Sequence, residues 1–214
     1  MKCTDCFRNV RPVVASDLDG SLAEYHEAVT KFACRYFNIA PPTFAYDGSE
    51  QFRDYLGLSK DQHRQMKLAY RQGGNKRMLR PYPGAVEFTD EMRAAGAELW
   101  VATTRPWQRL DNIDPDTQEW LRRTGIEIDG LLFGEDKYQQ LIEAVGIDRI
   151  VGVFDDLAVQ IDAARDLGLP AFQLHRPHNL HPTQRREPGG SLSEAILWGR
   201  DRIDEWNRRQ IGRA

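Results

Sequence analysis

The chain has 214 residues and a net charge of -3, with 41% hydrophobic and 29% charged residues, which suits one globular domain or a core domain with an insertion. Lys and Arg are scattered along the chain, so the concentrated basic face typical of nucleic-acid-binding proteins is not expected. No apolar run approaches the roughly 20 residues that span a bilayer. Residues 1–12, MKCTDCFRNVRP, lack the apolar centre of a secretory signal.

Short apolar runs alternate with amphipathic segments along most of the chain. Five of the runs predict strands that are apolar on both faces, at 11–16, 97–104, 130–134, 149–155 and 170–175. Helices are predicted at 83–96, 114–125, 135–146, 157–168 and 191–209, and in the last of them Leu197, Ile203 and Trp206 should face the core. This alternation predicts an α/β fold, a doubly wound, Rossmann-like, parallel five-stranded sheet.

One stretch, 22–80, contains no convincing strand. Residues 22–38 carry an apolar stripe at helical spacing, and 59–74 predict a second helix in which Ser59 and Gln62 match a capping box. We therefore expect a core domain formed by 1–21 and 81–214. The segment 22–80 should be a helical cap, inserted after the first strand and placed above the carboxyl edge of the sheet.

The N-terminal pair Cys3 and Cys6 has the spacing of half a zinc site. The histidines at 175–181 could supply the other half, but they follow the fifth strand, at the opposite end of the sheet from a segment that precedes the first. The chain has three cysteines, an odd number, so no disulfide framework is expected. We expect an ordinary reduced N-terminus and a cytoplasmic protein.

Polar side chains follow the predicted strands at the points where those strands end. In open α/β sheets ligands bind beyond the carboxyl ends of the strands, so these side chains should converge on one crevice. Several carboxylates in one crevice require a cation, and Mg²⁺ typically takes carboxylates, waters and a substrate phosphate. The side chains concerned are Asp17, Asp19, Thr103, Thr104, Arg105, Lys137, Asp155 and Asp156.

Four segments together resemble the motifs of the haloacid dehalogenase-like (HAD) superfamily of phosphatases. They are DLDGS at 17–21, VATT at 101–104, GEDKYQQL at 134–141 and VFDD at 153–156, in the order of the family and each at a strand end or helix start. The resemblance covers about residues 15–175. It implies a Mg²⁺-dependent phosphomonoester hydrolase that works through an aspartyl-phosphate intermediate.

The resemblance also implies a role for each motif residue. Asp17 would be the nucleophile, and Asp19 would protonate the leaving group and then activate water. Asp19 favours phosphoryl chemistry, because dehalogenases of the family lack this second aspartate. Thr103 would hold the phosphoryl oxygens, and Lys137 would pair with the phosphate and keep Asp17 ionised. The ligands of Mg²⁺ would be Asp17, Asp155, the backbone carbonyl of Asp19 and, in support, Asp156.

Two further features bear on the substrate. A cap inserted between the first and second motifs implies a small molecule, and the segments 80–106 and 170–181 are similar to the 5'(3')-deoxyribonucleotidase branch. A nucleoside monophosphate is therefore the leading substrate class. Arg105 departs from that branch and also occurs at this position in polynucleotide 3'-phosphatases. Candidate substrate contacts are Thr104, Arg105, Tyr25, His26 and Trp107, with Arg53 and Arg71 of the cap.

Two other functions stay open at this point. A phosphatase acting on nucleic-acid ends would need an open site and a basic track, and the cap argues against both. A binding or regulatory protein could keep the fold without turnover, but the intact motif aspartates argue against that. We expect a monomer or homodimer with a small phosphorylated substrate and no membrane partner, and we consider nucleic acid an unlikely partner.

Overall fold

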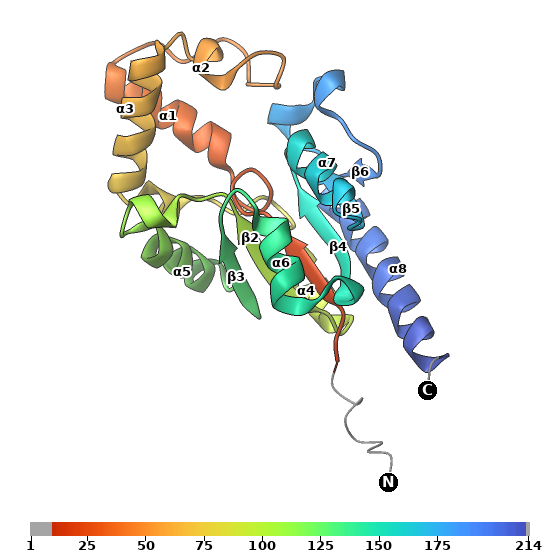
Figure 1. Ribbon diagram of the computed structural model, residues 1–214. Helices are drawn as coiled ribbons and strands as arrows, with labels where there is room; N and C mark the ends of the chain where they lie inside the picture. The colour runs from red at the N-terminus through yellow and green to blue at the C-terminus, as the bar shows by residue number, and fades with distance from the viewer. Residues whose placement is uncertain (1–9, 213–214) are drawn as a thin grey trace.

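The computed structural model describes residues 10–212, and a parallel sheet lies at the centre of this part of the chain (Figure 1). The strand order is β3-β2-β1-β4-β5-β6. The chain therefore builds the sheet in one direction from β1 to β3 and in the other from β4 to β6. The carboxyl ends of β1 and β4 meet at this reversal, which is where open α/β sheets bind ligands. The strands are β1 (Val13–Ser16), β2 (Glu98–Thr103), β3 (Gly130–Phe133), β4 (Ile150–Asp155), β5 (Ala171–Leu174) and β6 (Gly189–Gly190).

The sheet has six strands in the described residues, so the prediction of five was one too few. The additional strand, β6, pairs in parallel with β5 through Gln173–Gly189 and Leu174–Gly190. Its two residues are both glycine, which is depleted in strands. Nothing in the local sequence therefore marks β6, and only its pairing with β5 makes it a strand.

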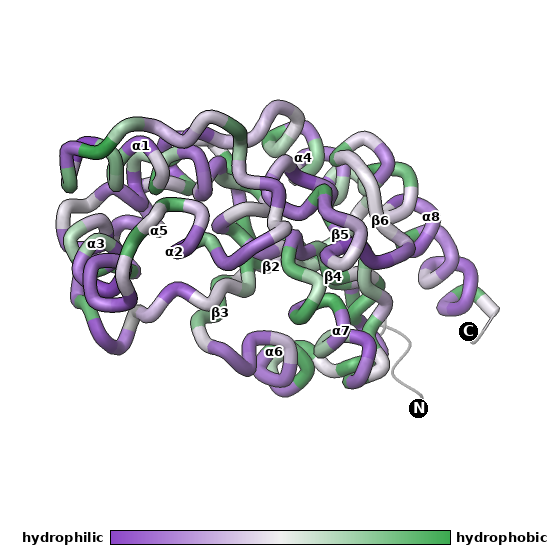
Figure 2. The backbone as a smooth tube through the Cα atoms, turned by 90° about the horizontal axis from the view of Figure 1, so that it is seen from above, coloured by the Kyte–Doolittle hydropathy of each residue, from purple (hydrophilic) through white to green (hydrophobic). Residues whose placement is uncertain are grey.

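Helices cover both faces of the sheet (Figure 2). α4 (Ala85–Ala94) and α8 (Leu192–Ile211) pack on one face, and α6 (Lys137–Val145) and α7 (Ala158–Asp166) pack on the other. Val14 belongs to the apolar cluster on the α4 face, whereas Val13 and Ala15 belong to the cluster on the α6 face. This alternation is the period of two expected of a strand buried on both sides.

The stretch between β1 and α4 is helical, as predicted. It contains α1 (Tyr25–Phe37), the short α2 (Phe52–Tyr55), α3 (Lys60–Gln72) and the 3₁₀ turn η1 (Asn75–Met78). Ser59 and Gln62 form the predicted capping box at the start of α3. We call the three helices α1–α3 the helical insertion, and Figure 1 shows it beyond the carboxyl ends of the strands.

One predicted core residue of α8 lies on the wrong side of the helix. Leu197 is 66% exposed, whereas Ile203 is buried and Trp206 packs against the core as predicted. The buried stripe of α8 contains Ala195 and Gly199, and a Cβ on Gly199 would lie 2.6 Å from the sulfur of Met92. Small residues therefore mark the buried side of this helix. None of the helices between residues 10 and 212 combines the length and the apolar character that a membrane crossing requires.

Candidate active site

The turn after β1 brings the first motif to β4. The Asp17 N–H donates to the carbonyl of Phe154 at 2.8 Å, which continues the strand pairing by one residue and places Asp17 beside Asp155. Gly20 then adopts a φ of +100°, and a Cβ there would lie 2.4 Å from a carboxylate oxygen of Asp156. Glycine is thus required in this turn for its conformation and for the close approach of Asp156.

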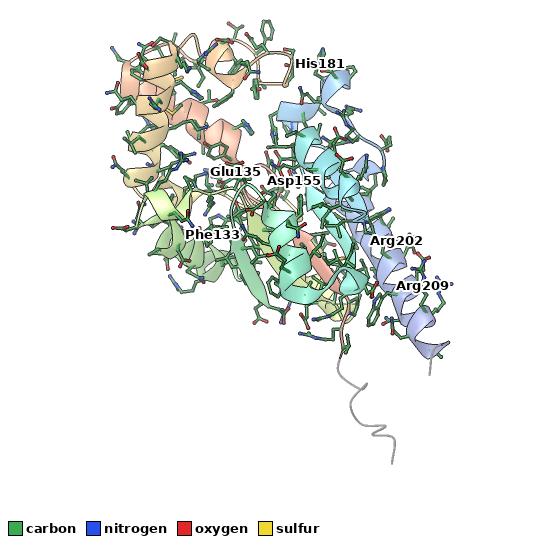
Figure 3. The ribbon with its side chains drawn as sticks, in the orientation of Figure 1. Phe133, Glu135, Asp155, His181, Arg202 and Arg209 are labelled. Carbon is green, nitrogen blue, oxygen red and sulfur yellow. The ribbon has the colours of Figure 1, made fainter. Side chains whose placement is uncertain are left out.

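Asp17, Asp155 and Asp156 form what we call the three-aspartate cluster. One oxygen of each lies within 4.8 Å of the others, and all three residues are buried. The ammonium of Lys137, at the first residue of α6, donates to Asp17 at 2.7 Å and to Asp155 at 2.6 Å. The hydroxyl of Tyr138 also donates to Asp155 at 2.7 Å. The first, third and fourth motifs therefore meet as the sequence predicts (Figure 3 labels Asp155).

The cluster carries more negative charge than Lys137 can balance. Burial raises the pKa of Asp17 well above its usual value, and although Lys137 opposes this, Asp155 and Asp156 add to it. Burial, with the charge of Asp155, raises the pKa of Asp156 to about 7. Burial disfavours the charge of Lys137, but its two carboxylate partners outweigh burial and raise its pKa. Three carboxylates around one ammonium are a donor set that fits a hard divalent cation such as Mg²⁺.

Asp156 is held on both of its oxygens by protein groups. The Ser21 hydroxyl donates to Oδ1 at 2.7 Å, and Nε2 of His178 lies 2.6 Å from Oδ2. The His178 ring stacks on His26 of the helical insertion, with centroids 3.9 Å apart. Burial and the charge of Arg176 lower the pKa of His178 to about 3, so the ring is neutral. The predicted contact residue His26 therefore lies on the Asp156 side of the cluster.

Asp19, although only two residues from Asp17, has a different environment. Arg105 donates to both of its oxygens, at 2.6 Å from Nη2 and 3.1 Å from Nε, and the ammonium of Lys76 also binds the carboxylate. Burial favours a higher pKa for Asp19, but Arg105 and Lys76 outweigh it and hold the pKa well below its usual value. Lys76 lies 3.9 Å from the ring centroid of Tyr25, which places this predicted contact residue beside Asp19.

The remaining predicted residues lie in several different parts of the structure. Thr103 ends β2 and is 1% exposed, and Thr104 lines a cavity of about 420 Å³ together with Arg105 and Arg71. Arg53 instead pairs with its neighbour Asp54, at 2.7 Å. The backbone of Trp107 lies in the 3₁₀ turn η2 (Trp107–Arg109), and its side chain is outside the described part of the structure.

Several contacts of the site are not evident from the sequence. Lys76 lies in the segment GGNKRM, which has no recognisable pattern, and it reaches Asp19 only because the chain returns from α3 past the site. From the sequence, His178 is a candidate zinc ligand and has no other expected role. Its position after β5, at the same edge of the sheet as Asp156, is the signal that could have revealed the contact. Ser21 belongs to the first motif and Tyr138 to the third, but the motifs imply no role for either residue.

The alternative zinc site receives no support from the described residues. Nε2 of His178 is committed to Asp156, and Nδ1 of His181 lies 2.8 Å from the Thr183 hydroxyl. Cys3 and Cys6 fall outside the residues that the structure describes, so the ordinary reduced N-terminus stays a prediction.

Known structures share the fold of this chain, although no protein-family model and no curated protein matches its sequence. A predicted phosphoglycolate phosphatase from Haemophilus somnus 129PT is 18% identical with a TM-score of 0.61, over 89% of this chain and 98% of that one. CbbY from Rhodobacter sphaeroides, solved with phosphate, is 19% identical with a TM-score of 0.60, over 89% and 99% of the two chains. The L-2-haloacid dehalogenase PA0810 is 14% identical with a TM-score of 0.57, over 87% and 97%.

The chain has a haloacid dehalogenase-like fold. Phosphatases and a dehalogenase share this HAD fold, so the fold alone does not select the reaction, and the residues of the site must decide it. None of the three structures is described as a nucleotidase, and the resemblance to the 5'(3')-deoxyribonucleotidase branch stays a prediction.

Proposed function

We propose that the protein is a Mg²⁺-dependent phosphomonoester hydrolase in which Asp17 is the nucleophile. The observation that carries this proposal is the placement of two neighbouring carboxylates in opposite environments. Asp17 lies in a carboxylate-rich cluster with Lys137, and Asp19 lies apart from it between Arg105 and Lys76. Environments that push the pKa values of two neighbouring carboxyl groups apart mark a site of acid–base chemistry. The motif resemblance then assigns Asp17 as the nucleophile and Asp19 as the acid and base.

The metal ligands would be Asp17, Asp155 and the backbone carbonyl of Asp19, with Asp156 in support. The ion, when bound, would neutralise negative charge on the phosphoryl group and so reduce its repulsion from the attacking carboxylate. The excess of carboxylates over ammonium groups in the three-aspartate cluster supports this proposal.

The proposed reaction has two steps. A carboxylate oxygen of Asp17 attacks phosphorus, the bond from phosphorus to the ester oxygen breaks, and Asp19 donates a proton to the leaving alkoxide. A water molecule then attacks the phosphorus of the aspartyl-phosphate, Asp19 takes its proton, and inorganic phosphate leaves with Asp17 regenerated. Lys137 and Thr103 would hold the phosphoryl oxygens during both steps.

Phosphoryl transfer is favoured over dehalogenation by Asp19. A departing halide needs no proton, whereas a departing alkoxide does, so the carboxyl group of Asp19 beside the nucleophile serves only the ester reaction. We further propose that 22–80 acts as a cap on a core formed by 1–21 and 81–214, and that the substrate is a small phosphorylated metabolite. The sequence resemblance favours a nucleoside monophosphate within this class.

The test is hydrolysis of an aryl phosphate by the purified protein with Mg²⁺. Asp17→Asn should remove the activity, as should chelation of the metal with EDTA, whereas Asp90→Asn on the exposed side of α4 should not. Activity that persists in Asp17→Asn would exclude the proposed nucleophile. A panel of nucleotides, sugar phosphates and 3'-phosphorylated oligonucleotides then separates the substrate classes, and preference for the oligonucleotides would contradict the metabolite proposal.

A further inference from the structure

Helix α3 of the insertion carries a row of cations along one side. Lys60, Arg64, Lys67 and Arg71 recur at spacings of four, three and four residues, so they share one helix face over roughly 16 Å. This face borders a cavity of about 550 Å³, whose other wall includes Arg109 after β2. We call the five side chains and this cavity the cationic groove.

The cations of the groove lack anionic partners in the part of the chain that the structure describes. Several Lys and Arg elsewhere in the fold form ion pairs, such as Arg77–Asp116 and Arg93–Asp129, but none of the five groove cations is in an ion pair among the described residues. Asp61 lines the same cavity, and Glu135 and Asp136 line the adjoining one (Figure 3 labels Glu135). These carboxylates are outnumbered by the cations, so the groove keeps a net positive charge.

Two residues that line the groove each have a buried polar atom without a hydrogen-bond partner. The atoms are Nε of Arg71 and Nε2 of His63. Buried donors are normally satisfied, and leaving one unsatisfied costs about 1–3 kcal/mol. Burial and the nearby charge of Arg71 also lower the pKa of Lys67, which indicates that these two cations repel one another in a partly desolvated place. An anion bound beside Lys67 and Arg71 would remove the repulsion between them.

The groove leads to the site where chemistry is proposed. Arg71, Pro106 and Arg109 line both the groove and the second cavity of about 420 Å³. Arg105 lines that second cavity and also binds Asp19 at 2.6 Å. A ligand with one end beside Asp19 and Asp17 can therefore extend along this path to Lys67 and Arg71.

We infer that the cationic groove binds a second phosphate group of the substrate, so that the substrate is a small bisphosphorylated metabolite and not the nucleoside monophosphate that the sequence resemblance favours. This inference rests on the proposed function, because it assigns the first phosphate to Asp17. A monophosphate would use only the cations at the catalytic centre and leave the groove uncompensated. Lys67, Arg71 and Arg109 around one cavity match a dianion, and the arginine fork suits phosphate oxygens in particular. The volumes of the two cavities are those of sites for small molecules.

The experiment compares matched pairs of substrates that differ by one phosphate. Suitable pairs are fructose 6-phosphate with fructose 1,6-bisphosphate, and adenosine 5'-monophosphate with adenosine 3',5'-bisphosphate. In at least one pair, kcat/KM should be at least tenfold higher for the bisphosphate. The double variant K67Q/R71Q, and independently Arg109→Gln, should bring the ratio within a pair close to one. Arg35→Gln removes an arginine from the exposed side of α1 and should leave the ratio unchanged.

Binding provides a readout that does not depend on turnover. Calorimetric titration of the bisphosphates should give a dissociation constant at least tenfold weaker for K67Q/R71Q than for the unmodified protein or Arg35→Gln. The inference is overturned if kcat/KM is the same for the bisphosphate and the monophosphate in every pair. It is also overturned if a preference for the bisphosphate survives in both groove variants. A preference for 3'-phosphorylated oligonucleotides that the groove variants abolish also overturns it, and assigns the groove to a nucleic-acid strand. Failure of the proposed function is a separate result, namely no Asp17-dependent hydrolysis of an aryl phosphate.

Discussion

Replacing Lys137 by methionine should destabilise the fold by about 3–5 kcal/mol at pH 7 in EDTA, since it removes one partner of a buried ion pair. Lys137 is 1% exposed and donates to two carboxylates, at 2.7 Å to Asp17 and 2.6 Å to Asp155. Methionine keeps most of the side-chain volume, so the loss comes from charge and hydrogen bonding. The three-aspartate cluster would then hold its carboxylates with no cation against them.

Proton uptake by the cluster sets an upper limit on this loss. Neutralising one carboxyl group whose ordinary pKa is near 3.9 costs about 4 kcal/mol at pH 7, at about 1.4 kcal/mol for each pH unit. The Lys137→Met variant can protonate one carboxyl group of the cluster at this cost, instead of keeping that buried carboxylate charged without Lys137. The two estimates agree, and they amount to a substantial part of the 5–15 kcal/mol by which proteins of this kind are stable.

Urea unfolding followed by circular dichroism measures the effect. Lys31→Met on α1 is the matched control, because Lys31 forms an exposed pair with Glu27 and should cost less than about 1 kcal/mol. Addition of Mg²⁺ should restore part of the stability of Lys137→Met, by about 2.7 kcal/mol at a concentration of 100 times Kd. A Lys137→Met variant within 1 kcal/mol of the unmodified protein in EDTA would refute the reasoning, because the carboxylates would then not depend on Lys137.

Three further outcomes are expected. Gly20→Ala should destabilise the fold by about 1–3 kcal/mol in urea unfolding, because φ is +100° and the new Cβ meets the Asp156 carboxylate; an unchanged midpoint would contradict the close approach. Asp19→Asn should lower kcat for alkyl phosphates by about 10²–10⁴, the range of general acid–base catalysis. The variant should also be less stable, because Arg105 and Lys76 lose their anion. Full turnover of alkyl phosphates by this variant would exclude Asp19 as the proposed acid. EDTA should stop aryl phosphate hydrolysis and Mg²⁺ should restore it, whereas metal-independent hydrolysis would be evidence against the three-aspartate site.

The parts of the fold that local sequence encodes were predicted well. The five longer strands and the principal helices lie within a few residues of their expected positions, because apolar runs, capping residues and turn glycines are local signals. Ser59 and Gln62 illustrate this, since their capping box was predicted and is present at the start of α3. The convergence of Asp17, Lys137 and Asp155 also followed from sequence, because parallel strands bring their carboxyl ends to one edge.

The parts that depend on packing between distant segments were not predictable in the same way. β6 is a strand only because Gly189 and Gly190 pair with β5. Leu197 was placed in the core by its apolar side chain, but α8 packs through small residues on its other side. The contact of Lys76 with Asp19 depends on the path of the chain out of α3, which no periodicity records.

The ionisation of the two motif aspartates indicates how substrate binding prepares the reaction. The proposed attack needs Asp17 ionised and Asp19 protonated, but without a metal or substrate burial raises the pKa of Asp17, and Arg105 with Lys76 lowers that of Asp19. A divalent cation at the three-aspartate cluster favours ionised Asp17. An incoming anion that draws Arg105 or Lys76 away from Asp19 removes the charges that hold its pKa low. The groove that we assign to a second phosphate adjoins the cavity lined by Arg105, so a substrate that extends through both would also allow Asp19 to take up the proton that it must donate.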